Sequence, residues 1–317
     1  MIHCSFIPFE LIKGFGFTPK RFVPSGKISD ESNGELHPGI CSWCKSLIGE
    51  MKNNDKFHFG SCTCDQMSRA LDTLKISSNC KAFLSHMPAT RNKGTFELFK
   101  SELSVLTEKL EDLSGKKFDK YLLKKEIEKS NNLKKEIGKL RPHLSGSDFV
   151  SLMHSVFQNW EIPETISNKN IKKKSHPKIA IAGSPTAKEG IKLLCEIEKF
   201  PAEIVFDATC TGDRFLELEI DENIDPFEAA ASAYFNQTPC IRARPNDDFF
   251  SWMNKKITDL EIDGVVWKTL RGCDLWNSEI QTAKELLSVP VLGLDYSYSD
   301  IDSHRIKTRI EAFLENL

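Results

Sequence analysis

The stretch KIAIAG at residues 178–183 opens the part of the chain whose pattern decides the fold. It is short and apolar and ends at a glycine, which is typical of a buried strand. Three similar stretches follow it, AEIVFDAT (202–209), DGVVWK (263–268) and VPVLGLDY (289–296). Helical patterns occupy residues 187–199, 226–236, 247–260, 275–287 and 303–316. Because parallel strands need crossover connections, this alternation predicts an α/β fold with a parallel sheet covered by helices on both faces.

The remainder of the chain divides into regions of different pattern. Residues 1–91 alternate short apolar strands with helices and predict an N-terminal α/β domain. Residues 92–166 predict a helical segment, because apolar side chains recur there in steps of three and four. Residues 167–177 are polar and rich in lysine, which predicts a linker. Residues 178–317 then form the C-terminal α/β domain.

The composition limits the possible partners. The 317 residues carry a formal net charge of −2, which argues against a general nucleic-acid-binding role. No run approaches the roughly 18 apolar residues that a membrane span needs. The first residues also lack the basic start and apolar core of an export signal. We therefore expect a cytoplasmic protein with no nucleic-acid partner and no membrane partner.

Ten cysteines are many for such a protein. Thiols stay reduced in the cytoplasm, so metal or cluster ligation is a better expectation than a disulfide framework. Cys41, Cys64 and Cys273 each stand directly before a predicted helix. The unpaired N–H groups and the dipole at a helix start favour a thiolate there. Three such ligands from distant segments could hold one metal centre and leave a coordination position free for chemistry.

The local spacing also permits a zinc site. Cys41 and Cys44 form a C-x2-C pair, and Cys62 and Cys64 form a C-x-C pair. Together these pairs are similar to a four-thiolate zinc pattern. The C-x-C pair is tight for zinc, however, and this arrangement leaves Cys273 without a role. Since soft thiolates bind iron–sulfur clusters as readily as zinc, spacing alone leaves both alternatives open.

Several longer segments carry a family resemblance. They are FIPFELIKGFGFTP (6–19), CSWC (41–44), CTCDQM (62–67), LEDLSGKKFDKYLLKKEIEKSNNLKKEI (110–137), DATCTGDR (207–214), GCD (272–274) and LDYSYSDIDSHRIKTRIEAFLE (294–315). In this order and with these gaps, the series resembles the 2-hydroxyacyl-CoA dehydratase and benzoyl-CoA reductase family over nearly the whole chain. Within that family, the chain is similar to the D-component type of subunit.

The resemblance implies a fold, a cofactor and partners. It implies two Rossmann-like domains with parallel sheets, a helical insert between them and a [4Fe–4S] cluster held at Cys41, Cys64 and Cys273. It further implies an ATP-hydrolysing iron–sulfur activator protein as electron donor, and a homologous second subunit or a homodimer. The implied substrate is an acyl-CoA thioester, which accepts the electron as a ketyl radical and then loses its hydroxyl group or is reduced.

Two other residues are candidates for catalysis. Glu10 lies in the first matching segment and could handle the proton of the leaving hydroxyl group. An ordinary glutamate at a helix start is an equal alternative. Ser42 follows Cys41 and could donate a hydrogen bond to substrate or cluster, or serve as a hydroxyl at the start of a helix.

Additional cysteines leave a second cofactor open. Cys44, Cys62 and Cys80 lie near the predicted cluster ligands in the sequence. They are compatible with the double-cubane cluster proteins, which are relatives that hold an [8Fe–9S] cluster and reduce small molecules. Cys44 lies one helical turn after Cys41 and is the candidate for an extra ligand. A non-catalytic electron-relay subunit or a zinc-binding subunit is the remaining alternative.

Overall fold

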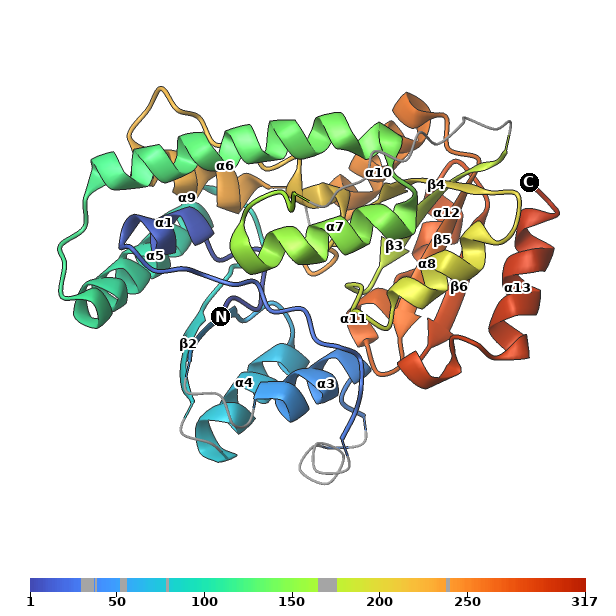
Figure 1. Cartoon of the computed structure of the whole chain (residues 1–317), viewed down its shortest axis with the longest axis horizontal. Helices are drawn as coiled ribbons and strands as arrows, with labels where there is room; N and C mark the ends of the chain where they lie inside the picture. The colour runs from blue at the N-terminus through green and yellow to red at the C-terminus, as the bar shows by residue number, and fades with distance from the viewer. Residues whose placement is uncertain (30–36, 38, 52–55, 78–79, 165–175, 238–239) are drawn as a thin grey trace.

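The computed structural model describes residues 1–29, 37, 39–51, 56–77, 80–164, 176–237 and 240–317. Nearly all of the predicted linker at 167–177 lies outside these residues. The described chain is a mixed α/β structure with two parallel sheets and many helices (Figure 1). The α/β prediction is therefore confirmed. None of the described helices has the length and apolar character that a bilayer span requires.

The predicted C-terminal sheet is present. Its strands are β3 (Lys178–Gly183), β4 (Glu203–Asp207), β5 (Gly264–Leu270) and β6 (Val291–Tyr296). They pair in parallel in the order β4-β3-β5-β6, which places β3 and β5 at the centre. Every residue of β5 is buried, as expected for a central parallel strand covered on both faces.

Helices cover both faces of this sheet, and alternate residues of each strand meet different helices. Ile181 and Val266 belong to the core that includes α8 (Ile191–Glu198) and α13 (His304–Leu314). The neighbouring positions Ala182 and Trp267 belong to a second core, which includes α10 (Asp247–Leu260) and α12 (Ile280–Leu286). This two-residue alternation is what a pleated strand between two helical layers requires.

One predicted helix is broken in the structure. Residues 275–287 were expected to form a single helix but form α11 (Asp274–Asn277) and α12. Trp267 Nε1 donates a hydrogen bond of 3.0 Å to the carbonyl oxygen of Trp276, within the buried aromatic group of the second core. A continuous helix would use that carbonyl for the N–H of Ile280. The tertiary contact of Trp267 therefore competes with the local pattern.

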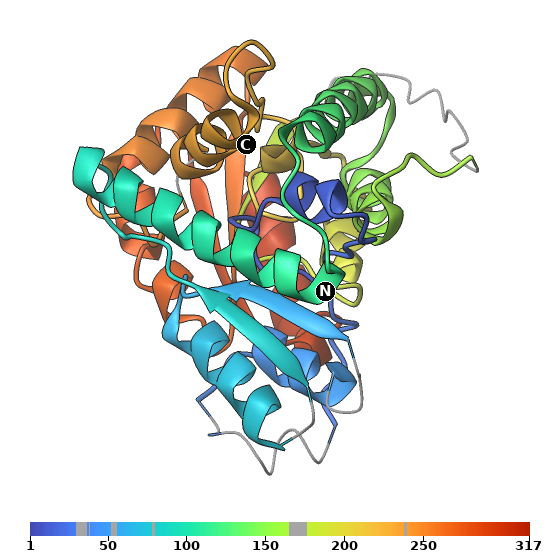
Figure 2. The same ribbon diagram turned by 90° about the vertical axis from the view of Figure 1, so that its left-hand side faces the viewer.

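The N-terminal region contains a smaller sheet. β1 (Phe57–Ser61) and β2 (Lys81–Ser85) pair in parallel, and Ile2 adds bridges to Arg21 and Phe59. The helices of this region are α1 (Phe9–Gly14), α3 (Ser42–Met51) and α4 (Asp65–Ser77). Figure 2 shows α4 on one side of the two strands and a long helix, α5, on the other. Because the described strands number only two, the Rossmann-like character of this region stays a prediction.

The predicted helical segment forms α5 (Lys93–Ser114), α6 (Lys120–Leu140) and α7 (Gly146–Asn159). Gly115 ends α5 in the left-handed conformation with φ +67°, which glycine adopts easily. α9 (Pro226–Asn236) packs against both α5 and α6, and α7 packs against β4 and α8. The helical segment is therefore joined to the C-terminal sheet by direct packing.

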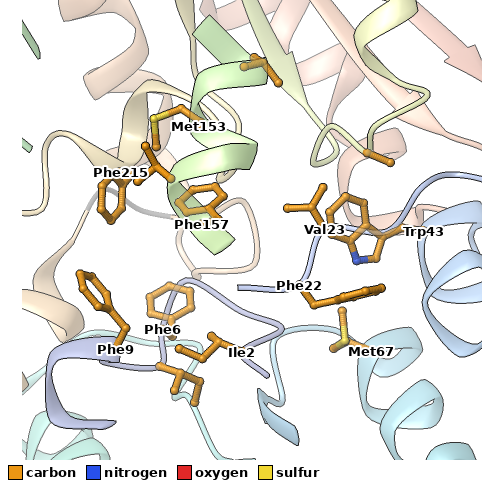
Figure 3. Close-up of a cluster of buried hydrophobic side chains, with 14 of the residues drawn as sticks. Ile2, Phe6, Phe9, Phe22, Val23, Trp43, Met67, Met153, Phe157 and Phe215 are labelled. Atoms are coloured by element: carbon orange, nitrogen blue, oxygen red, sulfur yellow. The ribbon is translucent and has the colours of Figure 1, made fainter. Parts of the chain in front are cut away.

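One hydrophobic core crosses the three predicted regions. Figure 3 shows its centre, where Phe6, Phe9 and Phe22 of the N-terminal region lie near Met153 and Phe157 of α7. The same buried group continues to the first turns of α3 and α4. The helix starts that carry the predicted cysteine ligands thus rest on the shared core.

Candidate functional site

The three predicted cysteine ligands occupy equivalent local positions. Cys41 and Cys64 directly precede α3 and α4, and Cys273 precedes α11. The backbone N–H of Met67 donates to Cys64 Sγ at 3.4 Å, three residues along the chain. Backbone N–H groups of the first turn help to lower the pKa of Cys41, and the N–H of Trp276 acts in the same direction on the pKa of Cys273. Cys64 Sγ thus takes the role of an N-cap acceptor, whereas Cys273 occupies the N-cap position of α11 without a side-chain capping hydrogen bond.

The structure brings the three cysteine segments together through Gln66. Gln66 Oε1 accepts a hydrogen bond of 2.6 Å from the backbone N–H of Cys41, and Gln66 Nε2 donates to the carbonyl oxygen of Gly272. Gln66 lies two residues after Cys64, and Gly272 directly precedes Cys273. We call this contact of Cys41, Gln66 and Gly272 the cysteine junction. Segments far apart in the sequence meet there.

Glycine is required at the cysteine junction for two reasons. Gly272 has φ +81°, a conformation that residues with a side chain rarely adopt. A Cβ atom at this position would also lie 2.6 Å from the carbonyl oxygen of Gly39 and 3.2 Å from Cys41 Cα. The backbone before Cys273 can therefore approach Cys41 only because residue 272 has no side chain.

Burial and the neighbouring thiols perturb the acidity of these cysteines. Burial raises the pKa of Cys64 to about 12 and the pKa of Cys273 to about 11, and the charge of Cys41 adds to both shifts. The pKa of Cys41 is lowered instead, chiefly because the Cys44 thiol donates a hydrogen bond to it. Helix-start N–H groups favour thiolates as predicted, but burial outweighs them at Cys64 and Cys273. A bound cation would offset that burial cost, so the donor set fits a metal or cluster with positive charge.

The additional cysteines differ in their positions. Cys44 is buried beside Cys41, and the charges of Cys41, Cys64 and Cys273 all raise its pKa. The Cys80 thiol instead donates to the carbonyl oxygen of Met51 at 3.4 Å, at the far end of α3. A helix of ten residues is about 15 Å long. Of these two cysteines, only Cys44 lies with the three predicted ligands.

The geometry also bears on a single metal ion. Among the residues that the structure describes, no three His, Cys, Asp or Glu side chains are arranged to share one ion. A four-thiolate zinc site needs its ligands around one point. In an iron–sulfur cubane each thiolate binds a different iron, so its ligands lie farther apart. The zinc site and the iron–sulfur cluster both stay predictions.

A second group of cysteines was not predicted. The Cys4 thiol donates to Thr63 Oγ1 at 3.7 Å, beside Cys64 in the sequence, and the charges of Cys210 and Cys240 contribute to a raised pKa at Cys4. Cys4 and Cys210 line a cavity of about 30 Å³, together with Arg21 and Tyr234. These cysteines come from three separate segments, so no local spacing could have indicated the group.

The predicted acid–base residue Glu10 lies among partners from the helices around it. Its carboxylate is fully buried, accepts hydrogen bonds from Ser130 Oγ at 2.5 Å and Tyr234 Oη at 2.7 Å, and lies 3.6 Å from Lys134 Nζ. We call these four residues the Glu10 cluster. Burial and Glu10 raise the pKa of Tyr234, whereas burial lowers the pKa of Lys134. These contacts support a structural role, and the acid–base role stays a prediction.

Ser42, the other predicted catalytic residue, is the first residue of α3 and is buried next to Cys41. Its position at the start of the helix agrees with both interpretations that the sequence allowed. Unlike Glu10, it lies directly beside one of the three cysteines.

A polar group lies at the carboxyl ends of the C-terminal strands. Asp207 ends β4, Lys268 lies near the end of β5 and Tyr296 ends β6, and all three are fully buried. Lys268 Nζ donates to the carbonyl oxygen of Ser184, while Asp207 Oδ2 and Tyr296 Oη have no hydrogen-bond partner among the described residues. We call these four residues the sheet-edge cluster. The only sequence signal was a lysine in the apolar stretch DGVVWK.

The sheet-edge cluster is electrostatically linked to Cys273. The charge of Cys273 contributes to the pKa shifts of both Lys268 and Tyr296, and the Cys273 N–H donates to the carbonyl oxygen of Leu270, the last residue of β5, at 2.8 Å. Burial lowers the pKa of Lys268 to about 8. Burial raises the pKa of Asp207, and Lys268 opposes that shift. The cysteine junction thus lies against the strand ends where ligands of parallel sheets bind.

Two comparisons with known proteins show the family of the chain. The family model of the 2-hydroxyglutaryl-CoA dehydratase D-component matches residues 4–317. The chain is also 23% identical to an Escherichia coli (strain K12) protein named "Putative dehydratase subunit YjiM", over 356 aligned positions that cover 99% of this chain and 90% of that protein. Both matches include all three helix starts that carry Cys41, Cys64 and Cys273.

Proposed function

Because the chain belongs to the 2-hydroxyglutaryl-CoA dehydratase D-component family, we propose that it is the iron–sulfur subunit of a dehydratase acting on 2-hydroxyacyl-CoA thioesters. The single observation that carries this proposal is the cysteine junction. It gathers three N-cap cysteines from distant segments beside the strand ends of a parallel sheet. In this proposal Cys41, Cys64 and Cys273 hold a [4Fe–4S] cluster.

The chain's own groups are suited to such a centre. A cubane held by three thiolates supplies a low-potential electron and one iron with a free position that polarises the thioester carbonyl. The backbone N–H of Met67 donates to Cys64 Sγ and favours the anionic state of that sulfur. Burial of Cys41 keeps water from its sulfur. In this proposal Ser42, which starts α3 beside Cys41, donates a hydrogen bond to a substrate oxygen.

The proposal includes partners and a compartment. The D-component is by name one part of a larger assembly. We propose an ATP-hydrolysing iron–sulfur activator protein as the electron donor, and a homologous second subunit or a second copy of this chain as the structural partner. All ten cysteines are free thiols, which is consistent with the reducing cytoplasm.

One observation favours a second candidate. Cys44 is buried one helical turn after Cys41, and the charges of all three predicted ligands contribute to its raised pKa. A fourth thiol beside the site is compatible with an [8Fe–9S] double cubane and with reduction of a small molecule. The same subunit could also relay electrons without binding substrate. These alternatives differ from the main proposal in iron content and in turnover.

Anaerobic purification followed by iron, sulfide and zinc analysis tests the proposal. We expect about four iron atoms and about four sulfides per chain, the content of one cubane. About eight iron atoms would favour the double cubane. Zinc with little iron would reject the iron–sulfur proposal. Reconstituted protein is then assayed with 2-hydroxyacyl-CoA thioesters and a low-potential reductant, and cluster content without turnover would favour the electron relay.

A further inference from the structure

Lys268 is an unusual residue for its position. It lies on the central strand β5 and is fully buried, whereas lysine side chains are seldom buried without a counter-ion. Removing an ammonium group from water costs several kcal/mol unless charges nearby compensate for it. Among the described residues, no carboxylate lies within 4 Å of Lys268 Nζ to form an ion pair.

Ser184 connects Lys268 to the cysteine junction. The backbone carbonyl of Ser184 accepts a hydrogen bond from Lys268 Nζ. The carbonyl of Leu270, whose N–H donates to Ser184 Oγ, accepts a hydrogen bond of 2.8 Å from the Cys273 N–H. Ser184 is itself fixed by two bonds to β5, since its N–H donates to the Lys268 carbonyl at 2.9 Å and its Oγ accepts from Leu270 N–H at 3.1 Å. The ammonium group and the backbone of Cys273 are therefore joined through Ser184 and Leu270.

The charged surroundings of Lys268 consist of groups on the strand ends. Asp207, Cys210 and Cys273 are the anionic or potentially anionic groups that favour its charged form. Asp207 Oδ1 accepts a hydrogen bond of 2.8 Å from the backbone N–H of Thr209, and its pKa is raised by burial. Additional negative charge at Cys273 would consequently be felt directly by Lys268.

We propose that Lys268 is a positioning residue that acts through Cys273, and that its buried ammonium group raises the reduction potential of the centre held there. This inference rests on the proposed function. Reduction adds one negative charge to the centre, and a nearby buried cation stabilises the reduced state more than the oxidised state. Lys268 thereby makes the centre easier to reduce by an external donor.

The test is a redox titration of the cluster-loaded full chain at pH 7, followed by EPR spectroscopy. Lys268→Gln removes the charge but keeps an N–H donor for the Ser184 carbonyl, and Lys268→Met removes both. We expect both variants to be about tenfold harder to reduce, which corresponds to a shift of about 59 mV toward negative potential for one electron. Lys268→Arg keeps the charge. Its reduction potential should therefore differ from the wild-type potential by less than about half of that shift.

Lys134→Gln is the matched control. Lys134 is also buried and donates to a backbone carbonyl, that of Leu218, but it lies in the Glu10 cluster. We expect this variant to keep the wild-type potential. Iron content and thermal unfolding are measured for every variant, because a merely structural lysine would alter those quantities and leave the potential unchanged.

Two results would overturn the inference while the proposed function stands. One is an unchanged potential in fully loaded Lys268→Gln and Lys268→Met. The other is loss of iron from both Lys268 variants while Lys134→Gln keeps its full iron content. Lys268 would then be needed to form the site and would not act by tuning its reduction potential. A wild-type chain that binds no iron–sulfur cluster would refute the proposed function itself, and this inference with it.

Discussion

The Glu10 cluster and the sheet-edge cluster are both buried and polar, but their polar atoms are paired to different extents. In the first, Glu10 receives hydrogen bonds from Ser130 and Tyr234 and lies beside Lys134, so its charge is compensated locally. In the second, Asp207 Oδ2 and Tyr296 Oη have no hydrogen-bond partner among the described residues, and Lys268 has no ion pair there.

This difference indicates that the Glu10 cluster stabilises the fold, whereas the sheet-edge cluster belongs to a functional site. The Glu10 cluster joins α1, α6 and α9 and uses nearly all of its polar atoms in doing so. The sheet-edge cluster keeps buried polar atoms without hydrogen-bond partners among the described residues, and Lys268 and Tyr296 interact electrostatically with Cys273. Buried polar groups that stay incompletely paired are costly, and such groups concentrate at functional sites.

The largest expected effect concerns Cys273. We predict that Cys273→Ser loses most of the cluster iron, although Cys273 is far from Cys64 in the sequence, because a three-thiolate site loses one ligand. Iron and sulfide analysis of anaerobically purified protein measures this effect. Cys195→Ser, which alters an exposed cysteine, serves as control and should retain full iron content. Full iron content in Cys273→Ser would remove Cys273 from the ligand set.

The next effect concerns the Glu10 cluster. Glu10→Ala should lower the free energy of unfolding by about 3–5 kcal/mol, because it leaves Lys134 buried without its carboxylate. Urea denaturation measures the loss, and Glu10→Gln combined with Lys134→Met should recover part of it. If Glu10→Gln instead keeps wild-type stability and abolishes turnover, the acid–base prediction for Glu10 gains support and the structural role of the cluster is refuted.

A smaller effect is expected at the cysteine junction. Gln66→Ala removes both hydrogen bonds that join Cys41 to Gly272 and should cost the cluster-free protein about 2–3 kcal/mol of stability. We also expect faster alkylation of Cys41, because its segment separates more readily from that of Cys273. Gln237→Ala is the control, since the Gln237 side chain likewise makes two hydrogen bonds to the backbone, both as donor, but lies outside the junction. Equal alkylation rates in the two variants would contradict the role of Gln66.

The smallest effect is a pH dependence of the free energy of unfolding that is caused by His154. Burial lowers the pKa of His154 to about 4, and Arg21, Lys188 and Lys268 add to the shift. Since the unfolded pKa is about 6.5, the unfolded chain binds the proton first, and stability is lost as pH falls from about 6.5 to 4. At pH 5 this amounts to about 2 kcal/mol. Urea denaturation at pH 5 and pH 7 measures this loss, and His154→Gln should reduce the difference in stability between the two pH values. An unchanged difference would contradict the role of His154.

Much of the fold could be predicted because it depends on local periodicity. The four C-terminal strands and the three helices of residues 92–166 follow directly from apolar spacing. The break between α11 and α12 could not be predicted, because it depends on the contact of Trp267 with the Trp276 carbonyl. The domain boundaries at 91, 166 and 177 remain predictions, since one hydrophobic core continues across the regions.

The candidate site was only partly predictable for the same reason. Cys41, Cys64 and Cys273 could be selected because each precedes a predicted helix, and in the structure each directly precedes a helix. The Cys4 group, the sheet-edge cluster and Gln66 had no comparable local signal. Their members come from different strands and loops and meet only after the chain has folded.

The amino-acid sequence by itself determined the α/β class, the helix starts that carry the cysteines and the family of the chain, because these follow from periodicity and local motifs. Tertiary structure alone decided that the cysteine segments meet through Gln66 and Gly272, that Glu10 is surrounded by partners and that Lys268 is joined to Cys273 through Ser184 and Leu270. The physical reason is that burial and charge depend on neighbours distant in the sequence. Such neighbours are chosen by packing, which local patterns do not encode.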